Sequence, residues 1–524
     1  MNFLASLFLA AVLGAACPLV PKPQSANASD GVFLLDASAK ICYEKGLEEP
    51  AQLLQWELLR WCGVASAVSE TGKRGPEGRS IIYRQSRKKG LEEQYSIIMR
   101  PQQVEILATS RKGFINGTMA FVQLARLASS KDGGPVEMGC WDIEDSPRYS
   151  WRGFMLDESR HFFGTRKVKQ ILDWMSLYRM NRFHWHLTDE PAWRIEIKKY
   201  PRLALVGGIG SWGDPDVPAR FYTQDEIREI VSYARERGIE IIPEIDMPGH
   251  ATAAVRAYPE FDGGGSEKRA SYTFNPGKEG TYAFLADILA EVDALFPSQI
   301  IHLGGDEVSY ANSDWSKDPD VKSLMEREGL SGLKEVELYF DRRVADSLFA
   351  LGNKIAAWDE VVEANLDPSK TISYFWRPNR TDMLQKALDQ GCEIVFCPRL
   401  PMYFDYAQDS LQVHGHDWWR FGPNTYRNVY DFETDSFDVK YPSDAKILGV
   451  QANLWTEKVY TEDRLDYMLF PRIAALAETC WTNRENKDLE DFNTRLKGQF
   501  VLYRKDGIYF CNPFDRAETG EPMR

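Results

Sequence analysis

The sequence predicts an α/β protein in which a small α+β domain precedes a closed (β/α)8 barrel. Two observations lead to this fold class. From residue 150 onward, short apolar segments alternate eight times with helical segments, a pattern that favours a closed barrel over an open sheet. Before residue 147 this alternation is absent, and a chain of 524 residues is long enough for two or three domains.

Residues 30–146 have the pattern of a mixed α+β domain. The strand candidates are residues 80–83, 95–99 and 103–108, and the helix candidates are residues 51–61 and 113–127. The second helix carries an apolar stripe of the kind that packs against a sheet. No recognisable site falls in this part, and Pro147 is a suitable domain boundary.

Residues 150–484 are predicted to form the barrel. The eight strand candidates are residues 153–156, 182–187, 240–245, 300–303, 355–358, 371–376, 393–397 and 447–454. Thr223 and Glu226 form a capping box at the start of the second helix, which ends at Gly238. The helical links are weakest between strands four and five and between strands seven and eight. Residues 485–524 are expected to form a helical extension.

The first 17 residues resemble a targeting segment. An apolar run over residues 3–13 is followed by small residues and then by Cys17. The run is too short to span a bilayer, so it predicts a signal peptide, although no Lys or Arg precedes it. Cys17 is also a candidate for lipid attachment. We therefore expect export to the periplasm or beyond, and no further segment that crosses a membrane.

The composition excludes some partners. A net charge of -14 argues against nucleic acid and anionic membranes, since either needs a basic face. The seven cysteines other than Cys17 are scattered, without a C-x-x-C metal site or a dense disulfide framework. Most of them are expected to be buried thiols, and one or two disulfides are left open. The oligomeric state is left open.

Ionisable side chains follow the first four predicted strands. The segments concerned contain Arg160 and His161, then His186 and Asp189, then Asp246 and His250, and finally Asp306 and Glu307. Active sites of (β/α)8 barrels lie at the carboxyl ends of the strands. A lone Asp after a strand is usually a cap or an ion-pair partner, but four such ends in succession indicate a catalytic site.

Asp306 and Glu307 form the sharpest motif. Burial and the like charge of a neighbour both raise a carboxyl pKa, as a general acid requires. Adjacent residues are unsuited to flank one bond at the roughly 5 Å separation of a retaining carboxylate pair. Either the partner carboxylate comes from another strand, or the nucleophile is not part of the protein. Gly304 and Gly305 would let substrate and backbone approach closely.

These segments resemble glycoside hydrolase family 20, the β-N-acetylhexosaminidases. The most specific match is HLGGDEV at residues 302–308. The others are RGFMLDESRH at 152–161, HLTD at 186–189, DMPGH at 246–250, WDE at 358–360, FWR at 375–377, YFD at 403–405 and LWTE at 454–457. The resemblance thus covers the whole predicted barrel in order, and the small preceding domain also matches the family's arrangement. One departure is EPA at residues 190–192, at the expected rim of the pocket.

The resemblance implies exo-acting hydrolysis of terminal β-linked N-acetylglucosamine or N-acetylgalactosamine. The sugar's own acetamido oxygen would attack the anomeric carbon and form an oxazolinium intermediate, so no second catalytic carboxylate is needed. Glu307 would be the general acid and then the base, and Asp306 would orient the acetamido N–H. The substrate-binding residues implied are Arg160, Asp189, His250, Trp358, Trp376, Tyr403, Asp405, Trp455 and Glu457.

Each binding residue has an implied task. Arg160 would hold ring hydroxyls, as suits a planar bidentate donor, and Tyr403 would donate to the acetamido oxygen. The three tryptophans would wall the acetamido pocket, and Asp405 and Glu457 would bind the outer hydroxyls. Asp189 and His250 would hold the acid and Arg160 in place.

Two alternatives remain open from the sequence. His184 and His186 share one face of a strand, a spacing that can chelate zinc in a metal-dependent barrel hydrolase. A carbohydrate-binding barrel without catalysis is the other alternative. The partner expected from the resemblance is a glycan or glycoconjugate with a terminal N-acetylhexosamine, and neither a cofactor nor a metal ion is expected.

Overall fold

The structure is a computed structural model that describes residues 16–522 apart from 73–76, 88–89, 131–133 and 416–421. Residues 1–15, the greater part of the predicted signal peptide, therefore lie outside the described residues. Among the described residues, no helix is long and apolar enough to cross a membrane.

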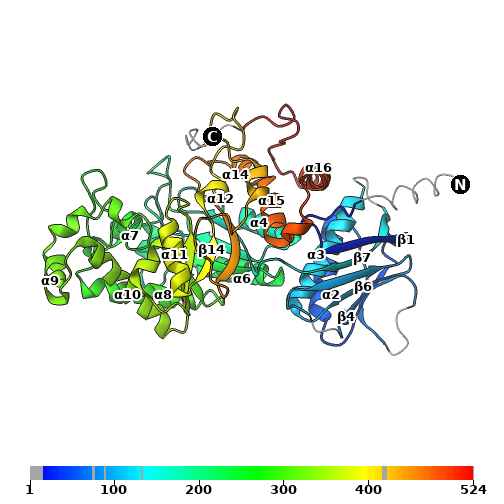
Figure 1. Ribbon diagram of the computed structural model, residues 1–524, viewed down its shortest axis with the longest axis horizontal. Coiled ribbons are helices and arrows are strands. Elements are labelled where there is room, and N and C mark those ends of the chain that lie inside the picture. Colours follow the sequence, from blue (N-terminus) through cyan, green and yellow to red (C-terminus); the bar gives the residue numbers. More distant parts are fainter. Residues whose placement is uncertain (1–15, 73–76, 88–89, 131–133, 416–421, 523–524) are drawn as a thin grey trace.

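The N-terminal part contains a seven-stranded mixed sheet, which lies at the right of Figure 1. Its strands are β1 (Ser25–Leu35), β2 (Lys40–Tyr43), β3 (Val68–Glu70), β4 (Ser80–Gln85), β5 (Tyr95–Met99), β6 (Gln103–Ala108) and β7 (Val136–Asp145), in the spatial order β1-β7-β5-β6-β4-β2-β3. Helices α2 (Glu48–Cys62) and α3 (Arg111–Ala128) accompany it. The α+β prediction is confirmed.

Strands β8 to β15 form the closed parallel barrel that the sequence predicts. They are β8 (Trp151–Asp157), β9 (Arg182–His186), β10 (Glu240–Glu244), β11 (Ile300–His302), β12 (Lys354–Trp358), β13 (Thr371–Phe375), β14 (Glu393–Phe396) and β15 (Lys446–Leu454). β15 pairs with β8 to close the ring. Most were visible in the sequence because strands buried on both faces are rich in apolar residues.

Helices cover the outside of the barrel. The α-helices are α4 (Thr165–Leu177), α5 (Arg202–Leu205), α6 (Gln224–Glu236), α7 (Thr252–Ala257), α8 (Glu279–Asp293), α9 (Pro319–Glu328), α10 (Leu333–Ala350), α11 (Thr381–Gln390), α12 (Arg399–Met402), α13 (Tyr426–Asp431), α14 (Glu462–Leu469) and α15 (Arg472–Trp481). Short 3₁₀ segments are η1 (Pro259–Phe261), η2 (Val308–Tyr310), η3 (Ser313–Ser316), η4 (Asp359–Ala364) and η6 (Arg484–Asn486). The predicted capping box of α6 is present at Thr223 and Glu226.

The expectation about the weakest helical links is partly wrong. The link from the fourth strand to the fifth contains both α9 and α10, so it is well supplied with helix. The weak link follows the fifth strand, where η4 is the only helical element between β12 and β13. In the link from the seventh strand to the eighth, the helices among the described residues are the short α12 and α13.

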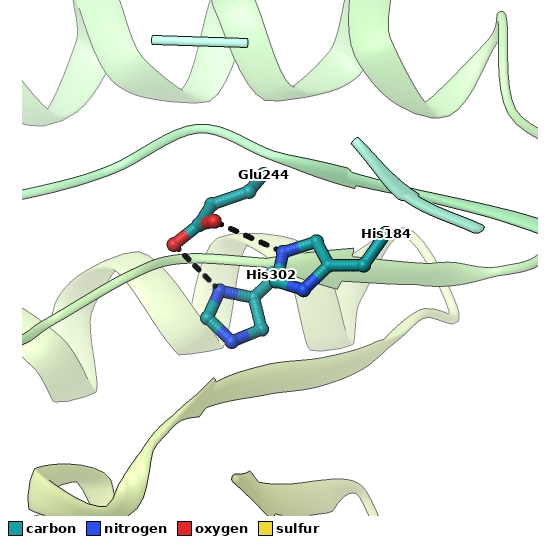
Figure 2. Close-up of side chains that lie close together, drawn as sticks. All are labelled: His184, Glu244 and His302. Atoms are coloured by element: carbon teal, nitrogen blue, oxygen red, sulfur yellow. Dashed lines mark ion pairs between the residues drawn. The ribbon is translucent and has the colours of Figure 1, made fainter. Parts of the chain in front are cut away.

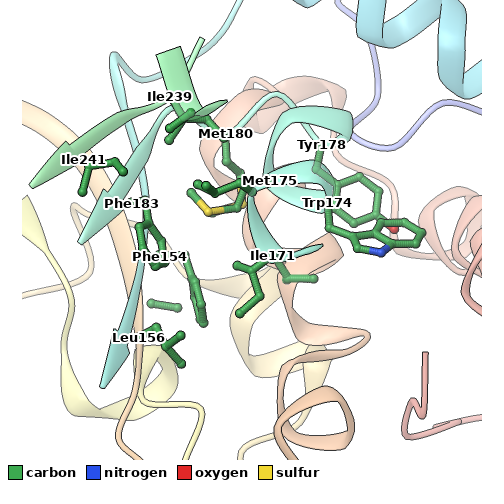
Figure 3. Packing of buried hydrophobic residues seen from close by; sticks show 14 of the residues in the cluster. Phe154, Leu156, Ile171, Trp174, Met175, Tyr178, Met180, Phe183, Ile239 and Ile241 are labelled. Carbon is green, nitrogen blue, oxygen red and sulfur yellow. The ribbon is translucent and has the colours of Figure 1, made fainter. Parts of the chain in front are cut away.

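Helix α4 joins the barrel wall to the rest of the chain. Its Ile171 and Met175 lie beside Phe154 and Phe183 of the first two barrel strands (Figure 3). Trp174 and Tyr178 point to the other side in the same view. There the Tyr178 hydroxyl lies 2.8 Å from that of Tyr503, on helix α16 (Leu489–Lys505). Two apolar faces on one helix thus tie the C-terminal segment to the barrel.

Buried ion pairs connect the sheet domain to the barrel and the C-terminal segment. Arg152, on the first barrel strand, forms an ion pair of 2.6 Å with Glu93. Arg126 of α3 lies 2.6 Å from Asp506, just after α16, and both side chains are buried. None of the eight cysteines forms a disulfide, and all but Cys17 and Cys62 are buried. Most of the thiols are therefore buried, as the sequence predicts.

Candidate active site

The residues predicted for the site gather where the carboxyl ends of the barrel strands meet. In strand order from β8 to β15 they are Arg160, Asp189, His250, Asp306 with Glu307, Trp358, Trp376, Tyr403 with Asp405, and Trp455 with Glu457. A pocket of about 160 Å³ lies at this end of the barrel. All of these residues line it except Asp189 and Trp358, which lie beneath its lining.

The loop after β11 carries the acidic pair through an unusual backbone. Gly304, Gly305 and Glu307 all have positive φ, of 69°, 89° and 53°. A Cβ on Gly304 would lie 1.8 Å from an Asp246 carboxylate oxygen, so only glycine fits there. The close approach at Gly304 is therefore made by Asp246 rather than by a substrate. Left-handed conformation at a residue as large as Glu307 is uncommon and is typical of functional sites.

Asp306 is a buried carboxylate with an unfilled contact. Its pKa is raised to about 7, chiefly by burial and also by the charge of the neighbouring Glu307, against the lowering effect of His250. Among the described residues, no hydrogen-bond donor reaches its buried Oδ1 atom. The His250 Nε2 atom lies 3.8 Å from Oδ2. An unpaired buried oxygen is costly, so this position suits a ligand that brings an N–H.

Glu307 occupies the more open side of the acidic pair. Its side chain is 38% exposed, whereas that of Asp306 is 13% exposed. Burial, expected for both residues, is thus marked only for Asp306. The Glu307 carboxylate lies 3.9 Å from His250 Nε2, so one imidazole faces both acids. A carboxyl that reaches the pocket opening can exchange protons with a leaving group and with water.

Asp189 organises the cations around this pair. Its Oδ2 atom accepts from Arg160 at 2.7 Å and from His186 at 2.8 Å, and its Oδ1 atom lies 2.9 Å from His250 Nδ1. Burial alone would raise the pKa of Asp189, but Arg160 and His250 bring it well below the usual range. Burial would lower the pKa of His250, but the negative charges of Asp189, Asp246 and Asp306 bring it well above its usual value. Asp189 therefore stays ionised and holds Arg160 and His250 in place.

The residues that diverge from the family motif lie just outside the pocket lining. Glu190 accepts from Arg269 at 2.5 Å, and its backbone N–H donates to Asp189 at 2.6 Å. The Glu190 carboxylate also lies 3.8 Å from His250 Nδ1, so this position borders the imidazole that faces both acids.

An aromatic wall closes the other side of the pocket. Trp376 and Tyr403 are stacked with ring centroids 6.3 Å apart at 12°, and Tyr403 lies 6.2 Å from Trp455. Trp358 packs beneath them, 5.8 Å from Trp455 and 6.5 Å from Trp376. Asn424 positions Tyr403, because its amide donates to the Tyr403 carbonyl at 2.9 Å. The result is a rigid apolar slot next to two carboxylates.

The remaining acids lie near Arg160. Its guanidinium is 3.8 Å from Glu457 and lies over the Trp455 ring, with its Cζ atom 4.9 Å from the ring centroid. Asp405 is buried in the same lining. This side of the pocket combines a fixed cation, two carboxylates and an aromatic face, which together suit a polyhydroxylated ring.

Sequence reasoning missed two residues of the lining. Arg399 and Tyr406 both face the pocket. They flank the YFD segment at residues 403–405, so their place in sequence offered a signal, but neither belongs to the motif itself. It also missed Glu244, at the end of β10, whose importance depends on strand pairing that the sequence does not reveal.

The zinc alternative does not fit the hydrogen bonds around His184. The Gln451 amide nitrogen donates to His184 Nδ1 at 3.0 Å, which leaves the proton of a neutral ring on Nε2. Burial and the nearby His302 lower the pKa of His184 to about 4, so the ring is neutral. The protonated Nε2 atom lies 2.9 Å from Glu244, whereas a metal ion binds a deprotonated ring nitrogen.

Comparison with known proteins agrees with this geometry. The model of the glycosyl hydrolase family 20 catalytic domain matches residues 149–484, and that of the family's domain 2 matches residues 16–146. The chain belongs to glycosyl hydrolase family 20. Both matches together span the sheet domain and the barrel.

Individual family 20 relatives are similar over most of the chain. A beta-hexosaminidase of Porphyromonas gingivalis is 33% identical over 96% of this chain, which spans 65% of that relative's length. One of Vibrio furnissii is 35% identical over 88% of this chain and 76% of its own. The crystal structure of an exo beta-N-acetylglucosaminidase of Vibrio harveyi, solved with N-acetylglucosamine, has a TM-score of 0.86 at 32% identity, covering 96% of this chain and 80% of that one.

Proposed function

We propose that this chain is an exo-acting β-N-acetylhexosaminidase that releases terminal non-reducing N-acetylglucosamine or N-acetylgalactosamine by substrate-assisted retaining catalysis. The observation that carries the proposal is the buried Oδ1 atom of Asp306, which has no donor among the described residues and lies in a pocket with an aromatic wall. A 2-acetamido group offers both features that this arrangement requires: an N–H for the carboxylate and a methyl group for the aromatic slot.

The reaction then needs one enzymatic acid. The acetamido oxygen forms a bond to the anomeric carbon while the bond to the leaving oxygen breaks and Glu307 gives that oxygen its proton. Asp306 orients the acetamido N–H and balances the positive charge of the oxazolinium ring. Water next attacks the anomeric carbon and loses a proton to Glu307, which restores the acid and retains the β configuration.

The other residues bind and orient. Tyr403 donates to the acetamido oxygen, and Trp376 and Trp455 hold the acetamido arm close to the anomeric carbon, so that little freedom is lost at the attack. Arg160, with Asp405 and Glu457, binds the outer hydroxyls. A pocket of about 160 Å³ suits the terminal sugar of a glycan better than the interior of a chain.

We also propose that the protein is exported, because residues 1–17 have the pattern of a signal peptide. Whether Cys17 carries a lipid decides between a periplasmic or secreted product and an anchored one. The mass of the N-terminal peptide, from protein isolated from its own cells, would separate these forms. An uncleaved N-terminus would contradict export by this route.

The activity is tested with chromogenic substrates and a labelled oligosaccharide. Nitrophenyl β-N-acetylglucosaminide should be cleaved, and the matching β-glucoside should be essentially inert because it lacks the acetamido group. An N-acetylglucosamine oligosaccharide labelled at its reducing end should lose one sugar at a time. Equal cleavage of both chromogenic substrates, or products several sugars long from the first turnover, would contradict the proposal.

A further inference from the structure

A cluster of one carboxylate and three histidines lies directly under the pocket, inside the barrel. The Glu244 cluster consists of Glu244, His184, His186 and His302, all fully buried. Figure 2 shows three of them, His184, Glu244 and His302. Strand pairing brings them together, because Glu244 is in register with His186 on one side and with His302 on the other. His184 lies two residues before His186 and therefore on the same face of β9.

The Glu244 carboxylate is surrounded by nitrogen atoms. Its Oε2 atom lies 2.5 Å from His186 Nδ1 and 2.9 Å from His184 Nε2. Its Oε1 atom accepts from Trp358 Nε1 at 3.0 Å and lies 3.0 Å from His302 Nδ1. Burial would raise the pKa of Glu244, but His186 and His302 bring it well below the usual range. The hydrogen bonds with His186 and Trp358, and two further imidazole nitrogens within 3.0 Å, hold this buried anion in position.

One connection leads from the Glu244 cluster to the polar side of the pocket. Glu244 and Asp189 contact opposite nitrogens of His186, at 2.5 Å and 2.8 Å. Asp189 in turn contacts Arg160 and His250. The orientation of the side chains that face the substrate thus depends, through His186, on Glu244.

A second connection leads to the apolar side. The indole N–H of Trp358 donates to Glu244, and the Trp358 ring supports Trp376 and Trp455 from beneath. The hydrogen bond fixes the tilt of the Trp358 ring, and the ring fixes the floor on which the aromatic wall rests. The residues on both sides of the pocket are therefore held, directly or through one neighbour, by the Glu244 carboxylate.

We propose that Glu244 is a positioning residue that sets the distance between the aromatic slot and the Arg160–His250 side of the pocket. The inference rests on the proposed function, since it assigns Glu244 the task of matching the pocket to a cyclised acetamido arm. Glu244 itself touches no substrate, because Trp358 and Asp189 lie between it and the pocket lining.

The test compares two ligands in Glu244→Gln, with Glu240→Gln as the control. Glu240 begins the same strand at the opposite end of the barrel and is 40% exposed. A thiazoline analogue has the shape of the cyclised intermediate, whereas product N-acetylglucosamine has an open acetamido arm. We expect Glu244→Gln to bind the thiazoline about 10²-fold more weakly, as for a displacement of about 1 Å at a catalytic site. The product should lose only a few-fold, and Glu240→Gln should match wild type for both ligands.

Folding and the parent proposal are checked separately. Glu244→Asp keeps the charge but shortens the side chain, so it should show a smaller selective loss of thiazoline affinity. This variant tests the positioning role if Glu244→Gln does not fold. Equal losses for thiazoline and product, or no loss, in a folded Glu244 variant would overturn the positioning role. Failure of wild-type protein to bind the thiazoline more tightly than the product would instead count against the proposed function.

Discussion

Asp189 and Asp306 are two buried aspartates of one site with opposite surroundings. Asp189 is contacted by Arg160, His186 and His250 within 2.9 Å, and the resulting pKa is well below the usual range. Asp306 has a more distant imidazole at 3.8 Å, a buried oxygen without a donor, and a pKa raised to about 7. The difference separates a structural carboxylate from one that is free to bind a ligand. All the contacts of Asp189 are with protein groups, whereas the Oδ1 atom of Asp306 lacks a donor among the described residues.

Their effects on stability have opposite signs with pH. The lowered pKa of Asp189 means that its contribution is present at neutral pH and is lost as the pH falls through the folded-state pKa. The raised pKa of Asp306 means that the folded state binds a proton more tightly than the unfolded chain. Its contribution therefore becomes unfavourable as the pH rises from aspartate's ordinary 3.8 to about 7.

The largest expected effect lies beside Asp306. Glu307→Gln should keep substrate binding but lower kcat by about 10²–10⁴-fold, the usual worth of general acid–base assistance. The loss should be greater for natural aglycones than for nitrophenol, because a good leaving group needs less protonation. Steady-state kinetics with a series of leaving groups measures this. A loss of the same size throughout the series would remove Glu307 from the role of acid.

The comparison itself is tested by two matched amide substitutions. Asp189→Asn leaves Arg160 and two imidazoles without their counter-charge and should lower the free energy of unfolding by about 3–5 kcal/mol. Asp306→Asn should lower kcat by about 10²–10³-fold, as for loss of an electrostatic group in a reaction centre, without loss of stability at pH 8. Urea unfolding at pH 8 and kinetics on the same samples distinguish them. Equal losses of stability in Asp189→Asn and Asp306→Asn would contradict the different roles assigned to the two aspartates.

A smaller effect concerns pH. Asp306 must be ionised to balance the oxazolinium charge, so kcat/KM should fall as the pH drops below about 7. The positive His250 lowers the pKa of Asp306, and His250→Gln should therefore move this acid limb to higher pH. Profiles of kcat/KM from pH 4 to pH 9, at about unit intervals, would show the shift. An acid limb at unchanged pH in the variant would mean that another group controls it.

The sequence predicted the barrel and the pocket lining better than the N-terminal sheet and the residues packed beneath the pocket. The barrel strands are buried on both faces and carry enough apolar residues to be visible without knowledge of their neighbours. Strand β1 was not found, because it is largely polar and its pairing with β7 shifts between Ser29 and Val32. The Glu244 cluster could not be predicted, since it exists only through the register of three strands.

The structure brings the motif residues together as expected. The sequence did not show which of them line the pocket and which lie beneath its lining. Trp358 was expected as a wall of the acetamido pocket but lies beneath the lining, with 1% of its surface exposed. Arg399 and Tyr406 enter the lining through the loop after β14, whose course has no periodic signal. Sequence motifs identify the residues of the active site. Which residues pack behind them depends on contacts between strands and loops that a motif does not contain.

The central claim is that the nucleophile belongs to the substrate and that Asp306 is arranged for its N–H. The most direct measurement is kcat/KM for N-acetyl, N-fluoroacetyl, N-difluoroacetyl and N-trifluoroacetyl glucosaminides with one leaving group. Fluorine withdraws electrons from the carbonyl oxygen while adding little bulk, so the rate should fall at each step of the series. A flat response, together with a sugar ester trapped on an enzyme carboxylate, would show that the protein supplies the nucleophile.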